Sequence, residues 1–154
     1  MTFKSIAGVF GALALASALS LAAGVGARAE DVGDDSLPKT FKCSFTSGAS
    51  WSYDAGTFQS KPPNPLAFSI EDIDLEKQSA TLKTQPDGKS GKLSVVRAIN
   101  ANHFLEVVNE GFLNLTTIYD KDTTAGKYPA VHSRHFGLLG QPVFGQYTGF
   151  CTAE

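Results

Sequence analysis

Short runs in which apolar and polar residues alternate recur along most of this chain. Phe41, Cys43 and Phe45 alternate with three polar residues, and a similar alternation returns over residues 66–74. A period of two residues is the pattern of a β-strand that buries one face. No segment shows the 3.6-residue period of an amphipathic helix. The sequence therefore predicts an all-β protein.

Further strand-like runs are separated by loops rich in Gly, Pro, Asn and Asp, which punctuate β-structure. These runs cover residues 80–84, 93–100, 103–108, 112–119, 127–136 and 142–151. Short strands at such regular spacing predict an antiparallel meander of about eight strands.

The first 29 residues have the three parts of a secretory signal peptide. Lys4 supplies the positive charge, residues 6–25 an apolar run, and Ala27-Arg28-Ala29 the small residues that a signal peptidase recognises. The apolar run is mostly Ala, Gly and Ser, which gain little from lipid. We therefore expect cleavage after Ala29, no membrane span after processing, and a periplasmic or secreted protein.

The rest of the chain divides into a short leader and one domain. Residues 30–38 are mostly acidic or polar and are expected to be a disordered leader, and residues 39–154 a single β-barrel-like domain. Cleavage lowers the number of basic residues from 13 to 11 and leaves all 15 acidic residues, so 125 residues carry a net charge of −4. A nucleic-acid partner is not expected, because it would need a basic face.

Two cysteines lie near the ends of this domain, Cys43 in its first predicted strand and Cys151 in its last. Two thiols in an oxidising compartment pair, and no C-x-x-C motif indicates a redox role. The bond would place the first and last strands together. A meander whose ends meet is a closed or nearly closed barrel, which has no free edges. A β-sandwich is the alternative.

Five segments of the chain also support a resemblance to known proteins. They are Phe41-x-Cys43, residues 70–74, Gly111 with residues 116–119, residues 130–135, and Gly149-Phe150-Cys151. Together they resemble a group of small exported bacterial proteins that are rich in β-structure, similar in size to lipocalins, and without an assigned function. The resemblance spans essentially the whole chain after residue 29 and implies no catalytic residues. We also expect no cofactor.

The densest group of polar side chains lies within residues 128–135. On a strand, Tyr128, His132 and Arg134 would share one face, which would suit a carboxylate or phosphate ligand. A protonated His132 would add charge, so binding would weaken as the pH rises through its pKa. The alternative is a surface strand whose polar groups contact only neighbours and water. His132 and His135 would point to opposite faces, so we expect no metal site.

Arg97 is a charged residue in an apolar strand pattern, since it shares a face with Leu93 and Val95. It could pair with a carboxylate such as Glu106, or it could anchor an acidic ligand inside a barrel. Both interpretations place its side chain on the inner face or at the barrel mouth.

No motif in the chain specifies a reaction, so the sequence favours a binding or structural role over an enzyme. One hypothesis is a barrel that binds a small apolar or weakly acidic ligand among inward aromatic side chains. These aromatic residues are Phe41, Phe45, Trp51 and Phe68. The alternative is an envelope protein with a filled core that interacts with another envelope protein. Eight strands leave room for either packed side chains or one small ligand, so the interior decides.

Overall fold

In a computed structural model, residues 37–84, 87–108, 111–138 and 140–154 are described, and these form nine β-strands. The strands are β1 (Phe41–Asp54), β2 (Thr57–Lys61), β3 (Leu66–Asp74), β4 (Ser79–Thr84), β5 (Ser90–Arg97), β6 (Ala101–Val108), β7 (Phe112–Tyr119), β8 (Tyr128–Leu138) and β9 (Gln141–Ala153). The predicted signal peptide and residues 30–36 of the predicted leader lie outside the described residues. No helix in the described part of the chain is long and apolar enough to cross a membrane.

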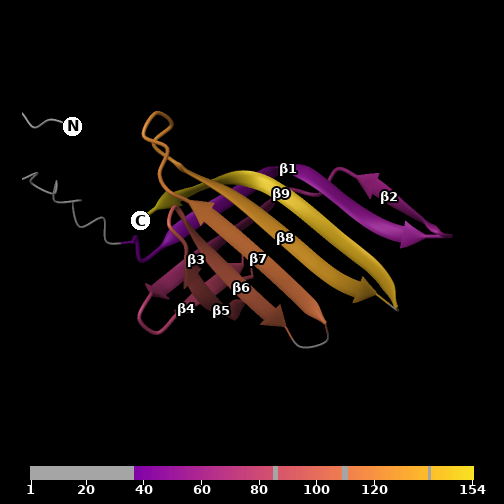
Figure 1. Cartoon of the computed structure of the whole chain (residues 1–154), viewed down its shortest axis with the longest axis horizontal. Helices are drawn as coiled ribbons and strands as arrows, with labels where there is room; N and C mark the ends of the chain where they lie inside the picture. The colour runs from indigo at the N-terminus through magenta and orange to yellow at the C-terminus, as the bar shows by residue number, and fades with distance from the viewer. Residues whose placement is uncertain (1–36, 85–86, 109–110, 139) are drawn as a thin grey trace, which may run out of the picture. The chain divides into compact units, whose positions relative to one another are not determined.

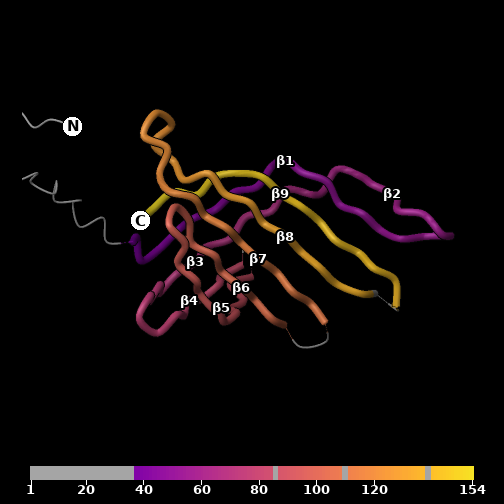
Figure 2. Tube along the Cα trace, in the orientation of Figure 1, coloured from indigo at the N-terminus to yellow at the C-terminus, as the bar shows by residue number. Residues whose placement is uncertain are grey.

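The strands pair antiparallel in the order β2-β1-β3-β4-β5-β6-β7-β8-β9, and β1 also pairs with β9. That last pairing closes β1 and β3 to β9 into an eight-stranded barrel, with β2 as one extra strand. The prediction of an all-β closed barrel is confirmed, and the sandwich alternative is excluded. Figure 2 shows β1 and β9 side by side, although they lie at opposite ends of the sequence.

A disulfide bond joins Cys43 to Cys151, which are direct partners in the β1–β9 register. Both side chains are buried in the core, so the bond is part of the barrel interior. Gly149 lies two residues before Cys151, and a Cβ atom there would collide with the backbone of Ser44. A glycine at this position therefore allows the two strands to approach closely.

The barrel interior is filled mainly by apolar side chains from alternate positions of every barrel strand. The core consists of Phe41, Cys43, Phe45, Phe68, Ile70, Ile73, Ala80, Leu93, Val95, Phe104, Ile118, Ala130, Tyr147 and Cys151. The inward expectation for Phe41, Phe45 and Phe68 is confirmed by their burial.

The fourth predicted inward aromatic residue, Trp51, lies on the opposite face of β1. The register of β1 against β9 shifts between Phe45 and Ser47, as in a β-bulge. One extra residue reverses which side chains face inward, because side chains alternate with a period of two. Trp51 therefore stacks on Phe144 on the outer face, with ring centroids 5.0 Å apart, and the prediction for Trp51 was wrong.

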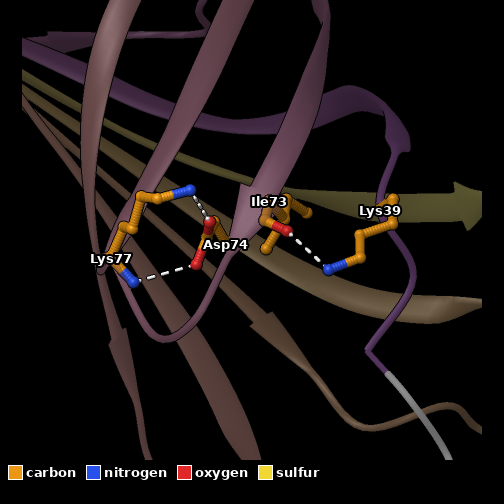
Figure 3. Close-up of polar contacts among 4 residues, drawn as sticks. All are labelled: Lys39, Ile73, Asp74 and Lys77. Carbon is orange, nitrogen blue, oxygen red and sulfur yellow. Dashed lines mark hydrogen bonds and ion pairs between the residues drawn. The ribbon is translucent and has the colours of Figure 1, made fainter.

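The turn from β3 to β4 is held by the carboxylate of Asp74 (Figure 3). Its two oxygens accept hydrogen bonds from the backbone N–H and the ammonium of Lys77, each at 2.8 Å. The hydrogen bond to the Lys77 side chain is the main cause of a lowered pKa of Asp74. Beside this turn, Lys39 Nζ donates to the carbonyl of Ile73 at 3.2 Å. The segment before β1 is therefore tied to the end of β3.

Strands β1, β8 and β9 are the longest and extend beyond the short strands of the barrel (Figure 1). The last residues of β1 pair with β2 on one side and with β9 on the other. The inner face of the barrel therefore continues over β8, β9, β1 and β2 past the barrel mouth.

Candidate functional site

The barrel interior is hollow at one end, where β3 and β7 begin and β4 and β6 end. This mouth cavity has a volume of about 310 Å³. Its walls are Leu66, Phe68, Leu82, Thr84, Glu106, Val108, Phe112, Asn114, His132 and Arg134. These residues come from β3, β4, β6, β7 and β8, so the cavity lies within the barrel.

The two sides of the mouth cavity differ in chemistry. Strands β3 and β4 contribute Leu66, Phe68 and Leu82, which form an apolar wall. The facing strands β6, β7 and β8 contribute a polar row of Glu106, Asn114 and Arg134. These three residues are successive cross-strand partners and therefore share one level of the barrel. Such a cavity matches a ligand that has one apolar face and one polar group.

Glu106 is held in place within the polar row. Its Oε2 accepts a hydrogen bond of 2.7 Å from Nδ2 of Asn114. Its Oε1 lies 2.5 Å from the position that a Cβ atom of residue 91 would take, so Gly91 leaves the space that the carboxylate fills. The carboxylate is therefore directed along the polar wall of the cavity.

Arg134 is half-buried and is the cation of the mouth cavity. Among the residues that the structure describes, no carboxylate forms an ion pair with it, although five other ion pairs occur there. A guanidinium has five N–H donors and no acceptor. Arg134 can therefore bind a carboxylate or a phosphate in a bidentate manner.

His132 lies deeper than Arg134 and is buried. Its Nδ1 is 2.9 Å from Oγ1 of Thr116, and its ring lies between those of Phe68 and Tyr147, at centroid distances of 5.2 and 5.8 Å. Burial, and secondarily the charge of Arg134, lowers the pKa of His132 to about 4. The imidazole is therefore neutral at neutral pH, and the expectation that it adds positive charge was wrong.

Tyr128 and Arg97 do not line the mouth cavity. Tyr128 packs edge-on against Phe41, with ring centroids 4.9 Å apart, and lies about 13 Å along β8 from His132. Arg97 is exposed at the same far end and pairs with Asp120 at 3.5 Å, not with Glu106. The structure therefore brings together His132 and Arg134 from the predicted group, and separates the other two.

A groove continues from the mouth cavity toward β2. It has a volume of about 420 Å³ and shares Leu66 and Arg134 with the cavity. Its other walls are Ser50, Lys61, Pro62, Pro63, Asn64, Pro65, Phe136, Val143, Phe144, Gly145 and Tyr147. This groove lies outside the barrel and is more polar than the mouth cavity. We call it the head groove.

Sequence reasoning did not identify Glu106, Asn114 or Lys61 as site residues. A signal was present for Glu106, which occupies the same strand phase as Phe104 and Val108 and so places a charge on an apolar face. No comparable signal marked Lys61, because the bulge in β1 determines which face of the β1–β2 hairpin continues the barrel interior.

The two neighbouring histidines of β8 lie on opposite faces, because His135 is exposed and stacks on Phe144 outside the barrel. Within the described residues, no three His, Cys, Asp or Glu side chains are grouped so that they could hold a metal ion.

No protein-family model matches the chain, and neither the curated proteins nor the solved structures provide a match.

Proposed function

We propose that this chain is an exported barrel that binds a small amphipathic acid in its mouth cavity. The observation that carries the proposal is Arg134, a half-buried guanidinium without an ion-pair partner among the described residues, placed opposite an apolar wall. A guanidinium that is partly removed from water is stabilised by an anion that it can bind through hydrogen bonds. An acid with a hydrocarbon chain would place its carboxylate against Arg134 and its chain against the apolar wall.

Two features support export. The bond between Cys43 and Cys151 is typical of a protein that folds in an oxidising compartment. The signal-peptide pattern of the first 29 residues also indicates export to such a compartment. The measurement is the intact mass of the exported protein, which should begin at Glu30; retention of residues 1–29 would contradict this part of the proposal.

Ligand binding is tested by calorimetric titration of octanoate into the wild-type protein and into Arg134→Gln. A charge-assisted hydrogen bond contributes about 1.5–3 kcal/mol, so the substitution should weaken binding about tenfold or more. Arg97→Gln is the matched control, because it removes an exposed arginine at the other end of the barrel. Its affinity should equal that of the wild type.

Equal octanoate affinities for the wild-type protein and Arg134→Gln would contradict the proposed anchor. Absence of octanoate binding, together with no retained small molecule in native mass spectrometry of the exported protein, would contradict the binding function. The alternative of an envelope protein without a small ligand would then be favoured, and the partly filled interior would be a structural feature only.

A further inference from the structure

One row of cross-strand partners connects the mouth cavity to the extra strand β2. Arg134 pairs with Gly145, Gly145 pairs with Ser50, and Ser50 pairs with Lys61. Direct partners on neighbouring strands point their side chains to the same side of the sheet. Lys61 and Arg134 therefore lie on one face, separated by three strand spacings, which is about 14 Å between Cα atoms.

The two residues between these cations are small. Gly145 has no side chain, and the hydroxyl of Ser50 donates a hydrogen bond of 3.3 Å to the carbonyl of Lys61. The middle of the head groove therefore carries no large side chain. The long cationic side chains of Arg134 and Lys61 lie on its two sides. All four residues line the groove.

Tyr147 adds a neutral donor to this arrangement. Its ring extends along β9 over Gly145, and its hydroxyl lies 3.5 Å from the position that a Cβ atom of residue 145 would occupy. The ring is buried and also contacts His132. The hydroxyl is thereby placed beside Gly145, in the lining of the head groove.

The charges of the head groove are unbalanced. Among the described residues, its lining includes Lys61 and Arg134 and no carboxylate. Neither cation has an ion-pair partner among the residues that the structure describes. A carboxylate would be satisfied by Arg134 alone, because a guanidinium binds its two oxygens bidentately. A second cation on the other side of this groove indicates a ligand with more oxygens and more charge.

We infer that the ligand is a single-chain amphiphile with a phosphate monoester head. Its hydrocarbon chain would occupy the mouth cavity against Leu66, Phe68 and Leu82, and its phosphate the head groove between Arg134 and Lys61. A phosphate monoester carries a charge of about −1.5 to −2 at neutral pH and three acceptor oxygens, which fits two cations and a tyrosine hydroxyl. This inference rests on the proposed function and narrows its ligand class.

The test is calorimetric titration with three probes, octyl phosphate, octanoate and inorganic phosphate. The proteins are the wild type, Lys61→Gln and the control Lys92→Gln. Lys92 is an exposed lysine on the outer face of β5, so its loss changes the net charge equally without touching the groove. Equal melting temperatures show that the three proteins are equally folded.

We expect the wild-type protein to bind octyl phosphate about tenfold more tightly than octanoate, because one more charge-assisted contact is made. Lys61→Gln should abolish this preference, because it should weaken octyl phosphate binding far more than octanoate binding. Lys92→Gln should keep the preference. Inorganic phosphate should bind far more weakly than octyl phosphate, because it has no chain for the apolar wall.

Four other outcomes would overturn the inference, and they can be distinguished. Equal binding of octyl phosphate and octanoate, or a preference that survives in Lys61→Gln, rejects the phosphate head but leaves the proposed binding function intact. Equal binding of octyl phosphate and inorganic phosphate rejects an amphiphile and indicates a free phosphate site. Binding of none of the probes rejects the inference and the proposed function together.

Discussion

The disulfide end and the mouth of the barrel are built from the same strands but filled differently. At the disulfide end, inward positions such as Phe41, Ile70 and Ile118 are completely buried. At the mouth, the corresponding positions on β6, β7 and β8 hold Glu106, Asn114 and Arg134, which are half-buried beside a cavity. One end is therefore packed for stability, whereas the other keeps polar groups facing an open volume.

This difference shows at which inward positions the residue type is explained by packing of the core. Burial of apolar surface explains the disulfide end, because each buried side chain there contributes favourably to folding. It does not explain a guanidinium without an ion-pair partner in the described residues at an inward position, since burial of a charge opposes folding. Residues at the mouth are therefore the ones that the proposed binding function would explain.

The largest expected loss of stability follows removal of the disulfide. The Cys43→Ser, Cys151→Ser double variant opens a loop with a sequence separation of 108 residues. In the chain-entropy model, this bond contributes about 4–5 kcal/mol. Urea unfolding of the double variant and the wild-type protein measures the difference. A loss below about 1 kcal/mol would show that packing alone holds β1 against β9.

A pair of phenylalanine substitutions compares the two ends directly. Phe41→Ala removes a completely buried ring at the disulfide end and should cost about 3–5 kcal/mol. Phe112→Ala removes a half-buried ring at the mouth, stacked on Phe136 at 5.3 Å, and should cost about 1 kcal/mol. Equal losses in urea unfolding would mean that the mouth is as tightly packed as the disulfide end.

The buried imidazole between the two ends predicts a pH dependence. The pKa of His132 falls from 6.5 to about 4 on folding, so the unfolded chain binds the additional proton between these values. Stability should therefore decrease as the pH falls from 6.5 to 4, by about 3 kcal/mol at most. Urea unfolding across this range measures the decrease, and His132→Gln should reduce it. An NMR titration that places the pKa of His132 above 6 would contradict the prediction.

The smallest effect is expected at the turn from β3 to β4, near the disulfide end. The pKa of Asp74 is lowered by its hydrogen bond from Lys77, so its contribution is complete above its ordinary pKa of 3.8. The contribution should disappear as the pH falls through the lowered value. Asp74→Asn should therefore be slightly less stable than the wild type at pH 6, and the difference should shrink as the pH falls below 3.8. A difference that does not change with pH would show that charge is not its cause.

The local pattern of the sequence was sufficient to predict most of the fold. Alternation predicted the strands, and the positions of the two cysteines predicted the meeting of the first and last strands. The same alternation correctly placed Tyr128, His132 and Arg134 on a common face. It could not show that Tyr128 lies at the far end of the barrel from Arg134, because a period of two identifies the face of a residue and not its depth.

The bulge in β1 marks the limit of this reasoning. Trp51 follows the expected inward phase if alternation is extended from Phe45, yet the register shift before Ser47 turns it outward. The same shift brings Ser50 and Lys61 onto the inner face. A bulge depends on how two strands pair, so a single run of residues does not reveal it.

By itself, the sequence determined that this chain is an all-β protein, which residues alternate along each strand, and that the first and last strands can be bonded. These properties depend on neighbouring residues and on two cysteines. Only the tertiary structure decided that one end of the barrel is open, that Arg134 and Lys61 share one face with Gly145 and Ser50 between them, and that His132 is neutral at neutral pH. Those properties depend on the pairing of distant strands and on burial, which local alternation does not encode.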